Sequence, residues 1–266
     1  MAKLKPEISL TFLGTSTSTG VPVIGCPCPI CTSGDPLLTR TRSSIHLQTE
    51  EISILVDSGP DLREQALREG LSRVDAVLYT HAHLDHITGF DELRAFCWHR
   101  DELLPLYGSA ACLDEIKRMF SWAFLPTNTY RGYIKPAPVE TSGPFNLGKL
   151  TITPIPVIHG SVETQGYRFD LPGSPSIAYL PDVKIIPDDS MELLANIPVL
   201  ILDCLHRREH PTHMNLDEAL TAAQNLAAER VYLTHISHEL DIASVELPSH
   251  ISFAHDGLKL DFPVTT

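Results

Sequence analysis

Short runs of aliphatic and β-branched residues recur along the chain, and turn-forming residues separate them. This pattern predicts strands at Ile8–Leu13, Ser44–Gln48, Ile52–Val56, Ala76–Tyr79, Leu150–Ile155, Ser176–Leu180, Pro198–Leu202 and Arg230–Leu233. Between the strands, hydrophobic residues recur at helical spacing, and each such segment opens near an Asp, Ser or Asn that can cap a helix. The predicted helices are Asp61–Glu69, Ser109–Phe120, Asp188–Ala195 and Leu216–Ala228.

The order of these elements predicts one mixed α/β (α+β) domain that covers residues 1–266. In the first half of the chain, strands follow one another with short turns, which favours sheets packed on each other and flanked by helices. Many α/β chains of about this length form one unit around a single extended core. No internal repeat, low-complexity tract or flexible linker interrupts the pattern.

The composition is that of an ordinary globular protein, with 43% hydrophobic and 20% charged residues. The formal net charge is −13. An acidic surface repels a polyanion, so we expect a small-molecule substrate and no nucleic acid polymer as partner. The sequence holds no apolar window of membrane-spanning length and no secretory leader pattern at its start, so we expect a cytoplasmic protein without membrane contact.

A cluster of potential metal ligands follows the predicted strand Ala76–Tyr79: His81, His83, Asp85 and His86. In an extended segment, His81 and His83 point to the same side and can grip one divalent ion. Asp85 and His86 come after the chain turns, so they can reach a second ion nearby. Burying three histidines and one aspartate within six residues would be costly without a cation, which makes a purely structural role a poor explanation.

Three further candidate ligands stand where later strands stop. They are His159, Asp182 and His235. A lone histidine is more often a satisfied core or surface residue than a ligand, but here each follows a predicted strand. Since a carboxylate has two oxygens and can bridge two metals, Asp182 is the natural bridging ligand. The sequence therefore predicts a binuclear metal site.

Three of the six cysteines lie close together at Cys26, Cys28 and Cys31. In a reducing compartment such a trio indicates metal binding rather than a disulfide, although free loop thiols are the alternative. The other cysteines lie in apolar surroundings and are interpreted as buried thiols: Cys97, Cys112 and Cys204.

These motifs resemble the metallo-β-lactamase superfamily in order and spacing. The matching segments are His81-Ala82-His83-Leu84-Asp85-His86, His159-Gly160, Tyr179-Leu180-Pro181-Asp182 and Leu233-Thr234-His235. The resemblance covers almost the whole chain and implies an αββα sandwich, with two metals at one edge between the sheets. It implies that one metal is held by His81, His83 and His159, and the other by Asp85, His86 and His235. Asp182 would bridge the two.

A second resemblance narrows the choice. The run Cys26-Pro27-Cys28-Pro29-Ile30-Cys31 is similar to the cysteine cluster of PhnP-like phosphodiesterases. It implies a structural zinc held by three cysteines and one histidine, which by position is His238. Four such ligands suit a closed tetrahedral site that ties the N-terminal loop to the last strand. For His238, an ordinary surface histidine is the alternative.

The family resemblance also marks His213 and Asp57. His213 would hydrogen-bond a phosphoryl oxygen or protonate a leaving oxygen, although a solvated loop histidine is the alternative. Asp57 would orient metal ligands. By contrast, His206 and His210 have no partner that the sequence can assign, and they are interpreted as structural.

Two loops are left without an assigned role. The loop from Gly14 to Gly20 is rich in Ser and Thr, which suits either an anion site or simple turns. The loop from Leu125 to Pro138 is rich in Pro, Gly and Tyr, and we expect it to shape the cleft.

The resemblance implies a metal-dependent phosphodiesterase acting on a small cyclic phosphodiester, such as phosphoribosyl 1,2-cyclic phosphate or a cyclic nucleotide. Two Zn or Mn ions would present a bridging hydroxide, with Asp182, Asp85 and His213 as catalytic residues and His213 also binding substrate. Alternatives are a carboxylic ester, thioester or lactone hydrolase on the same fold, and a non-catalytic metal- or nucleotide-binding module. A tRNA-processing nuclease is disfavoured by the acidic charge. A homodimer is a further expectation from the resemblance.

Overall fold

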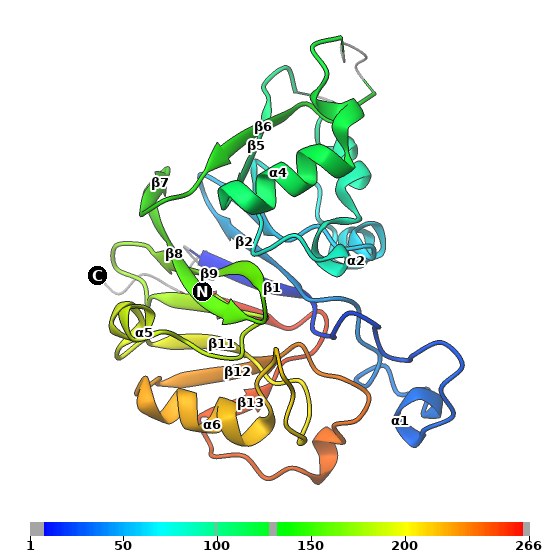
Figure 1. Cartoon of the computed structure of the whole chain (residues 1–266), viewed down its shortest axis with the longest axis vertical. Helices are drawn as coiled ribbons and strands as arrows, with labels where there is room; N and C mark the ends of the chain where they lie inside the picture. The colour runs from blue at the N-terminus through cyan, green and yellow to red at the C-terminus, as the bar shows by residue number, and fades with distance from the viewer. Residues whose placement is uncertain (1–7, 99, 128–131, 263–266) are drawn as a thin grey trace, which may run out of the picture.

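The computed structural model describes residues 8–98, 100–127 and 132–262. Two seven-stranded sheets form the centre of the fold (Figure 1). In spatial order, the first sheet holds β14 (Lys259–Phe262), β1 (Ile8–Gly14), β2 (Ser44–Thr49), β3 (Ser53–Val56), β4 (Ala76–Leu78), β5 (Leu104–Gly108) and β6 (Pro136–Glu140). The second holds β13 (Ile251–Phe253), β12 (Arg230–Thr234), β11 (Val199–Asp203), β10 (Ile177–Leu180), β9 (Val162–Asp170), β8 (Leu150–His159) and β7 (Phe145–Leu147).

Helices pack on the outer face of each sheet. The α-helices are α1 (Pro29–Thr32), α2 (Leu62–Glu69), α3 (Leu84–Ile87), α4 (Ala110–Met119), α5 (Asp188–Leu194) and α6 (Leu216–Asn225). The short 3-10 helices are η1 (Phe90–Phe96), η2 (Ser121–Phe124) and η3 (Ile242–Ser244). The layers follow the order α/β/β/α, as expected from the sequence.

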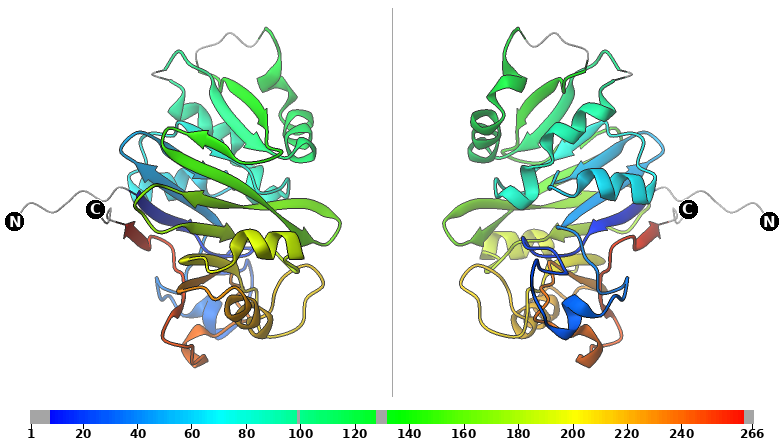
Figure 2. Two further views of the ribbon diagram at one scale, coloured as in Figure 1. Left: turned by 90° about the vertical axis from the view of Figure 1, so that its left-hand side faces the viewer. Right: turned by 90° about the vertical axis from the view of Figure 1, so that its right-hand side faces the viewer.

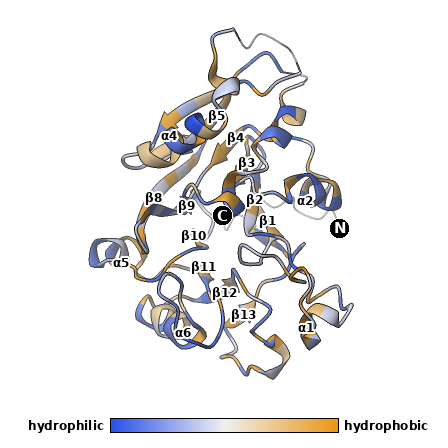
Figure 3. Ribbon diagram, turned by 45° about the vertical axis from the view of Figure 1, so that its right-hand side comes forward, coloured by the Kyte–Doolittle hydropathy of each residue, from blue (hydrophilic) through white to orange (hydrophobic). Residues whose placement is uncertain are grey.

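Three hydrophobic clusters hold the four layers together. The middle cluster joins the facing sides of the two sheets, and the outer two join each sheet to its helices. Strand β11 is wholly buried and contributes to two of these clusters. Val199 and Ile201 face the other sheet. Leu200 and Leu202 face α5 and α6. A strand buried on both faces needs an unbroken apolar run, which is why this segment lacks alternation. Figure 3 shows hydrophobic segments along the central strands and hydrophilic ones on α5.

The direction of the strands decides where the polar loops gather. Strands β10, β11 and β12 run parallel to one another, and β3 runs parallel to β4. Their carboxyl ends carry Asp182, Asp203, His235 and Asp57. Carboxyl ends of parallel strands meet at one edge of a sheet, where α/β proteins bind ligands. The helices of the described part of the chain include none that is long and apolar enough to cross a membrane.

Each strand predicted from the hydrophobic pattern is present, with small differences at its ends. Strand β8 extends four residues beyond the predicted end, up to His159. Several strands were not predicted, among them β6, which contains two prolines, and β9, which mixes polar and apolar residues on a buried strand. Pairing with neighbours forms these strands, because their own residues carry little strand signal.

The predicted helices are also present, but only two have the expected side-chain cap. Ser109 accepts from the backbone of Cys112, and Asn215 forms a capping box with Glu218 at the start of α6. Helix α5 follows Pro187 and has no side-chain cap. Asp61 precedes α2 but does not cap it with its side chain. Its carboxylate instead accepts hydrogen bonds from the backbone N–H and the guanidinium of Arg42.

The loop from Leu125 to Pro138 is described only in part, because residues 128–131 lie outside the described residues. Near it, Leu125, Thr127 and Tyr133 line a cavity with Trp122. None of the candidate metal ligands lines that cavity, so the expectation that the loop shapes the cleft of the functional site stays a prediction.

Close backbone packing brings the loop after β3 to the loop that carries Asp85. A Cβ on Gly59 would overlap the carbonyl oxygen of Asp85. We therefore expect Gly59→Ala to lower the free energy of unfolding by about 1–3 kcal/mol, the usual cost of overpacking. Gly143→Ala is the control, because a Cβ there meets nothing within 4 Å. Denaturant unfolding measures both variants, and equal stability of Gly59→Ala and wild type would contradict this packing argument.

Candidate metal centres

Seven polar side chains meet at the edge where the carboxyl ends of the strands of both sheets come together. They are the seven expected from the sequence: His81, His83, Asp85, His86, His159, Asp182 and His235. They come from the loop after β4, from α3, from the end of β8 and from the loops after β10 and β12. Five of the seven are buried, with at most 2% of their surface exposed: His81, His86, His159, Asp182 and His235.

The first group consists of His81, His83 and His159. The Nδ1 atom of His83 lies 2.9 Å from Nε2 of His81 and 3.3 Å from Nε2 of His159. Where such ring nitrogens are unprotonated, their lone pairs face one another and repel. A cation among them turns that repulsion into coordination, and three imidazoles are a common ligand set for zinc.

The second group surrounds Asp182. One carboxylate oxygen of Asp182, Oδ1, lies 3.2 Å from Nε2 of His86, and the other, Oδ2, lies 3.2 Å from Nε2 of His235. Oδ2 is also 3.9 Å from Nε2 of both His81 and His159. Asp182 thus lies between the two groups, at the position that a bridging carboxylate requires.

Asp85 completes the second group. Its Oδ2 atom lies 3.3 Å from Nε2 of His86 and 4.0 Å from Nε2 of His235. Together with Asp182, the ligand atoms of these residues all lie within 4.8 Å of one another. Two carboxylates and two imidazoles in so small a space are a ligand set that could hold a second divalent ion.

The outer nitrogen of three of these histidines is held by a hydrogen bond. The pairs are His81 Nδ1 with Thr80 Oγ1 at 3.0 Å, His86 Nδ1 with Asp57 Oδ2 at 2.8 Å, and His159 Nδ1 with the Thr212 carbonyl at 2.8 Å. A proton on Nδ1 leaves Nε2 free as a ligand, which is how metal-binding histidines are oriented. Burial lowers the pKa of His81 and that of His159, the latter to about 4, so both rings stay neutral.

Electrostatics in the second group favour added positive charge. Burial by itself would lower the pKa of His86, but the carboxylates of Asp182, Asp85 and Asp57 outweigh it and hold the pKa well above its usual range. Burial would likewise raise the pKa of Asp182, yet His235 and His86 hold it well below its usual range. The Asp182 carboxylate thus stays ionised and attracts a cation.

Unpaired atoms at the centre test whether metal ions fit. Nε2 of His86, Nε2 of His235 and Oδ1 of Asp182 are buried and have no hydrogen-bond partner within the described ranges. Leaving one buried polar atom unpaired costs about 1–3 kcal/mol. These three atoms face one another, so divalent ions would satisfy them together, and the donor set fits a metal pair.

Asp57 supports this centre from behind. Its carboxylate accepts hydrogen bonds from the backbone N–H and the hydroxyl of Thr80, at 2.8 and 2.9 Å, as well as from His86. Asp57 and His235 both have positive φ angles, 64° and 58°, which are uncommon for residues other than glycine. Such conformations gather at functional sites. Asp57 therefore makes the orienting contact that the sequence led us to expect.

The Ser- and Thr-rich loop from Gly14 to Gly20 packs against the segment after His235. The backbone N–H of Ile236 donates to the carbonyl of Thr15, and the hydroxyl of Ser16 donates to the carbonyl of Ile236. The backbone N–H of Ser16 donates to Thr41. Ser16 thus uses both of its hydrogen-bond donors within the protein, and the loop holds the segment after His235 in place.

The ring of His213 lies next to one histidine of each ligand group. The centroid of its ring is 4.6 Å from the ring of His159 and 4.6 Å from that of His235. Its Nδ1 atom lies 2.8 Å from Oδ2 of Asp203, which also accepts from the backbone N–H of Val183. This pair fixes the ring of His213 and leaves its Nε2 for another contact.

The sequence analysis did not identify Asp203. It directly follows the predicted strand Pro198–Leu202, much as Asp182 follows a predicted strand, and that shared position is the signal that would have found it. Asp203 is wholly buried, and its Oδ1 lies 3.7 Å from Nδ1 of His235. One carboxylate thus lies against both His213 and His235.

A separate group of potential ligands lies at the arm that carries α1. The Sγ atoms of Cys26 and Cys28 lie 3.3 and 3.4 Å from Nδ1 of His238, and the Sγ of Cys31 completes a set within 4.8 Å. The cysteines are free. Figure 2 shows this arm beside the last loops of the chain, where His238 lies. The structure thus brings together all four residues of the expected zinc site.

Two backbone N–H groups donate hydrogen bonds to sulfur atoms of this group. The N–H of Cys31 donates to Cys28, and the N–H of Val23 donates to Cys31. The first bond, together with His238, lowers the pKa of Cys28 to about 6, while burial raises the pKa of Cys31 to about 11. Thiolates are the form that binds zinc, so Cys28 is ready to bind at neutral pH.

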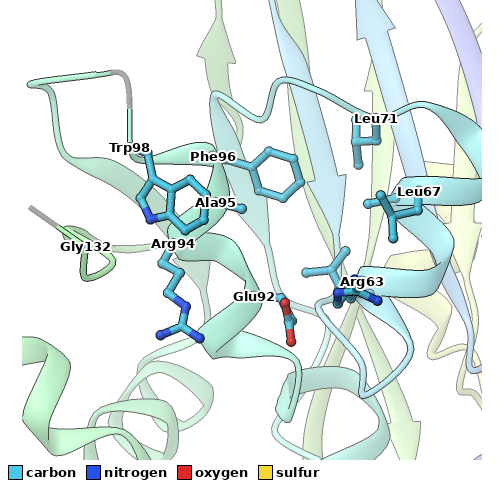
Figure 4. Close-up of a pocket in the computed structure, with 11 residues that line it drawn as sticks. Arg63, Leu67, Leu71, Glu92, Arg94, Ala95, Phe96, Trp98 and Gly132 are labelled. Atoms are coloured by element: carbon cyan, nitrogen blue, oxygen red, sulfur yellow. The ribbon is translucent and has the colours of Figure 1, made fainter.

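A cavity of about 810 Å³ lies between α2 and η1 (Figure 4). Leu67, Phe96 and Trp98 give it an apolar lining, and Arg63 and Arg94 add charge at its sides. None of the candidate metal ligands lines it. The chemistry of the chain therefore lies outside this cavity.

Comparisons with known proteins agree with this geometry. A family model described as a beta-lactamase superfamily domain matches residues 53–236. The crystal structure of a new diphosphatase from the PhnP family is 41% identical, with a TM-score of 0.87 over 97% of this chain and 98% of that chain. Zinc-bound PqqB from Methylobacterium extorquens shares the fold at 21% identity, with a TM-score of 0.79 over 95% of this chain and 99% of that chain.

Two curated relatives are longer than the region they share with this chain. An octanoyltransferase of Porphyromonas gingivalis is 36% identical over 255 residues, which are 93% of this chain and 50% of that protein. A ribonuclease Z of Bradyrhizobium diazoefficiens is 29% identical over 209 residues, or 73% of this chain and 62% of that protein. The chain thus spans about half of the first relative and less than two thirds of the second. By its family match, its fold and its PhnP-family neighbour, the chain belongs to the metallo-β-lactamase superfamily of metal-dependent hydrolases and is a PhnP-like member of it.

Proposed function

We propose that this chain hydrolyses small phosphodiesters, with cyclic phosphates of ribose or nucleotides as the first class to test. The observation that carries the proposal is the position of Asp182, whose two oxygens each lie 3.2 Å from a histidine nitrogen of the second group and near the first group. Such a centre suits displacement at phosphorus, because two divalent ions, when bound, neutralise phosphate oxygens and activate water.

In this proposal, the chain's own residues place the ions and handle a proton. His81, His83 and His159 would hold one ion, while Asp85, His86 and His235 would hold the other, with Asp182 shared between them. His213, oriented by Asp203, would donate a hydrogen bond to a phosphoryl oxygen or a proton to the oxygen that leaves phosphorus. Hydrolysis breaks one P–O bond, adds water to phosphorus and returns the proton to the leaving oxygen.

Charge and similarity guide the choice of substrate. A net charge of −13 disfavours a long polyanion, so a small phosphate fits the chain better than a nucleic acid polymer. The PhnP-family neighbour is described as a diphosphatase, which adds diphosphates to the candidate substrates. Thioesters and lactones belong in the same screen as the acyl alternative, since the same ions also activate water toward acyl carbon.

The first test removes ligands of the second group. We expect wild-type protein loaded with Zn²⁺ or Mn²⁺ to cleave bis(p-nitrophenyl) phosphate. Asp182→Ala and His86→Ala should lose more rate than the roughly 10–100-fold that loss of an outer partner costs. Metal content, measured on the same samples, should fall with the rate.

Asp189→Ala is the matched control, because Asp189 is an exposed residue of the first turn of α5. It should keep both rate and metal content. Wild-type activity in Asp182→Ala would remove the binuclear proposal.

A second test separates ligand binding from proton handling. Asp203→Asn replaces the carboxyl group that lies 2.8 Å from Nδ1 of His213 with an amide of nearly the same size. We expect kcat for bis(p-nitrophenyl) phosphate to fall by about 10–100-fold with metal content unchanged, because His213 loses the carboxylate that orients it. An unchanged kcat would show that Asp203 has no part in the reaction.

A third test addresses the proposed zinc at the α1 arm. Cys28→Ser should lower the zinc content by one ion per chain and lower the thermal midpoint, because binding a structural metal stabilises the fold. Cys112→Ala is the comparison, since it removes a buried thiol away from the arm and should leave zinc content unchanged. A full zinc complement in Cys28→Ser would reject the structural site.

A further inference from the structure

The segment between β11 and α6 places a second histidine beside His213. The ring of His210 has its centroid 5.1 Å from the ring of His213 and 5.7 Å from that of His206. His210 is partly exposed, whereas His213 is largely buried. His213 therefore lies next to the candidate metal ligands, and His210 lies on the outer side of His213.

Hydrogen bonds define which nitrogen of His210 is free. The backbone N–H of Thr212 donates to Nδ1 of His210 at 3.3 Å, and the hydroxyl of Thr212 lies at the same distance. A neutral imidazole that accepts at Nδ1 carries its proton on Nε2. Within the described ranges, no protein atom hydrogen-bonds that Nε2–H, so it is a donor available to a ligand.

The same residue, Thr212, ties His210 to the metal centre. Its carbonyl accepts from Nδ1 of His159 at 2.8 Å, while its N–H contacts His210. Gly160 lies against this residue, where a Cβ would crowd the Thr212 methyl group. The position of His210 is thus fixed relative to a proposed metal ligand, which a binding residue requires.

The surroundings keep His210 neutral. Burial lowers its pKa, and His213, His206 and Lys184 add to the effect. Lys184 is itself paired with Glu218 at 2.7 Å. A neutral donor beside cationic and imidazole groups suits an oxygen that bears negative charge or a lone pair.

We propose that His210 is a substrate-binding residue whose Nε2–H donates a hydrogen bond to an oxygen of the leaving group. This inference rests on the proposed function, in which His213 faces the oxygen that departs from phosphorus. The group beyond that oxygen extends past His213, where His210 lies. The oxygen belongs either to a second phosphoryl group or to a ribose, and the substrates below separate the two.

Two substitutions test the two ring nitrogens of His210 separately. In His210→Asn, the side-chain amide reaches the position of Nδ1, so the contact with Thr212 is kept and the outer donor is lost. In His210→Gln, the longer amide reaches the position of Nε2, so the outer donor is kept. His250→Asn is the control, because His250 is exposed and lies away from the metal centre. Its backbone carbonyl accepts from the N–H of Val231, at the opposite end of β12 from His235.

Three substrates vary the leaving group. Bis(p-nitrophenyl) phosphate releases an aromatic group, a nucleoside 2′,3′-cyclic phosphate releases a ribose hydroxyl, and diadenosine diphosphate releases AMP. We expect His210→Asn to lower kcat/KM about ten-fold for the substrate whose oxygen is bound, the loss typical of one hydrogen bond to a charged or polar oxygen. The rate on bis(p-nitrophenyl) phosphate should change less than about two-fold, and His210→Gln should stay within about three-fold throughout.

The pattern of losses decides between the interpretations. A loss on diadenosine diphosphate alone identifies a phosphoryl oxygen, and a loss on the cyclic phosphate alone identifies a ribose oxygen. Equal losses on all three substrates, no loss on any, or a larger loss in His210→Gln than in His210→Asn would overturn the inference, because each indicates a role confined to Thr212 or none.

Calorimetric binding of AMP and of adenosine provides a readout that does not depend on turnover. His210→Asn should weaken the binding of at least one of them about ten-fold, while His210→Gln and His250→Asn keep the wild-type affinity. Unchanged affinity for both in His210→Asn would count against the inference. Failure of wild type to cleave any of the three substrates would instead reject the proposed function.

Discussion

Desolvation of Asp182 between inward-facing imidazoles is the constraint on which the rest of this structure depends. A buried carboxylate with an unpaired oxygen, facing histidine nitrogens that also lack partners, is unfavourable unless positive charge lies among them. The fold keeps these groups buried because two sheets present their strand ends to one point. The closeness that makes these groups costly to bury without a cation also favours the binding of divalent metal.

The supporting residues show how the fold holds this arrangement. Asp57, Thr80 and Thr212 fix outer nitrogens of the histidines, and the loop from Gly14 to Gly20 holds the segment after His235. Positive φ angles at Asp57 and His235 add local strain that this packing must hold. Metal affinity in this chain is therefore a property of the surrounding network as well as of the ligands.

In the proposed function, one short segment between β11 and α6 forms the side of the centre that faces the substrate. It supplies His213, oriented by Asp203, and then His210, oriented by Thr212. The arm that carries α1 lies apart from this segment, and its cysteines lie against His238. The proposed reaction and the proposed structural zinc site thus use different parts of the chain, which is why their variants are expected to affect different measurements.

The sequence by itself determined the layered α/β class, most of the central strands and the residues that gather at the metal centre. Ligands such as His81 and Asp85 are close in sequence, and His159, Asp182 and His235 each stand at a strand end, so pattern and spacing sufficed. Only the tertiary structure showed the contacts of Asp203, Thr212 and His210 beside this centre. Their partners come from distant segments, and a contact between side chains far apart in sequence leaves no periodic trace along a single chain. For the same reason, strands such as β9 appear only once their neighbours pair with them.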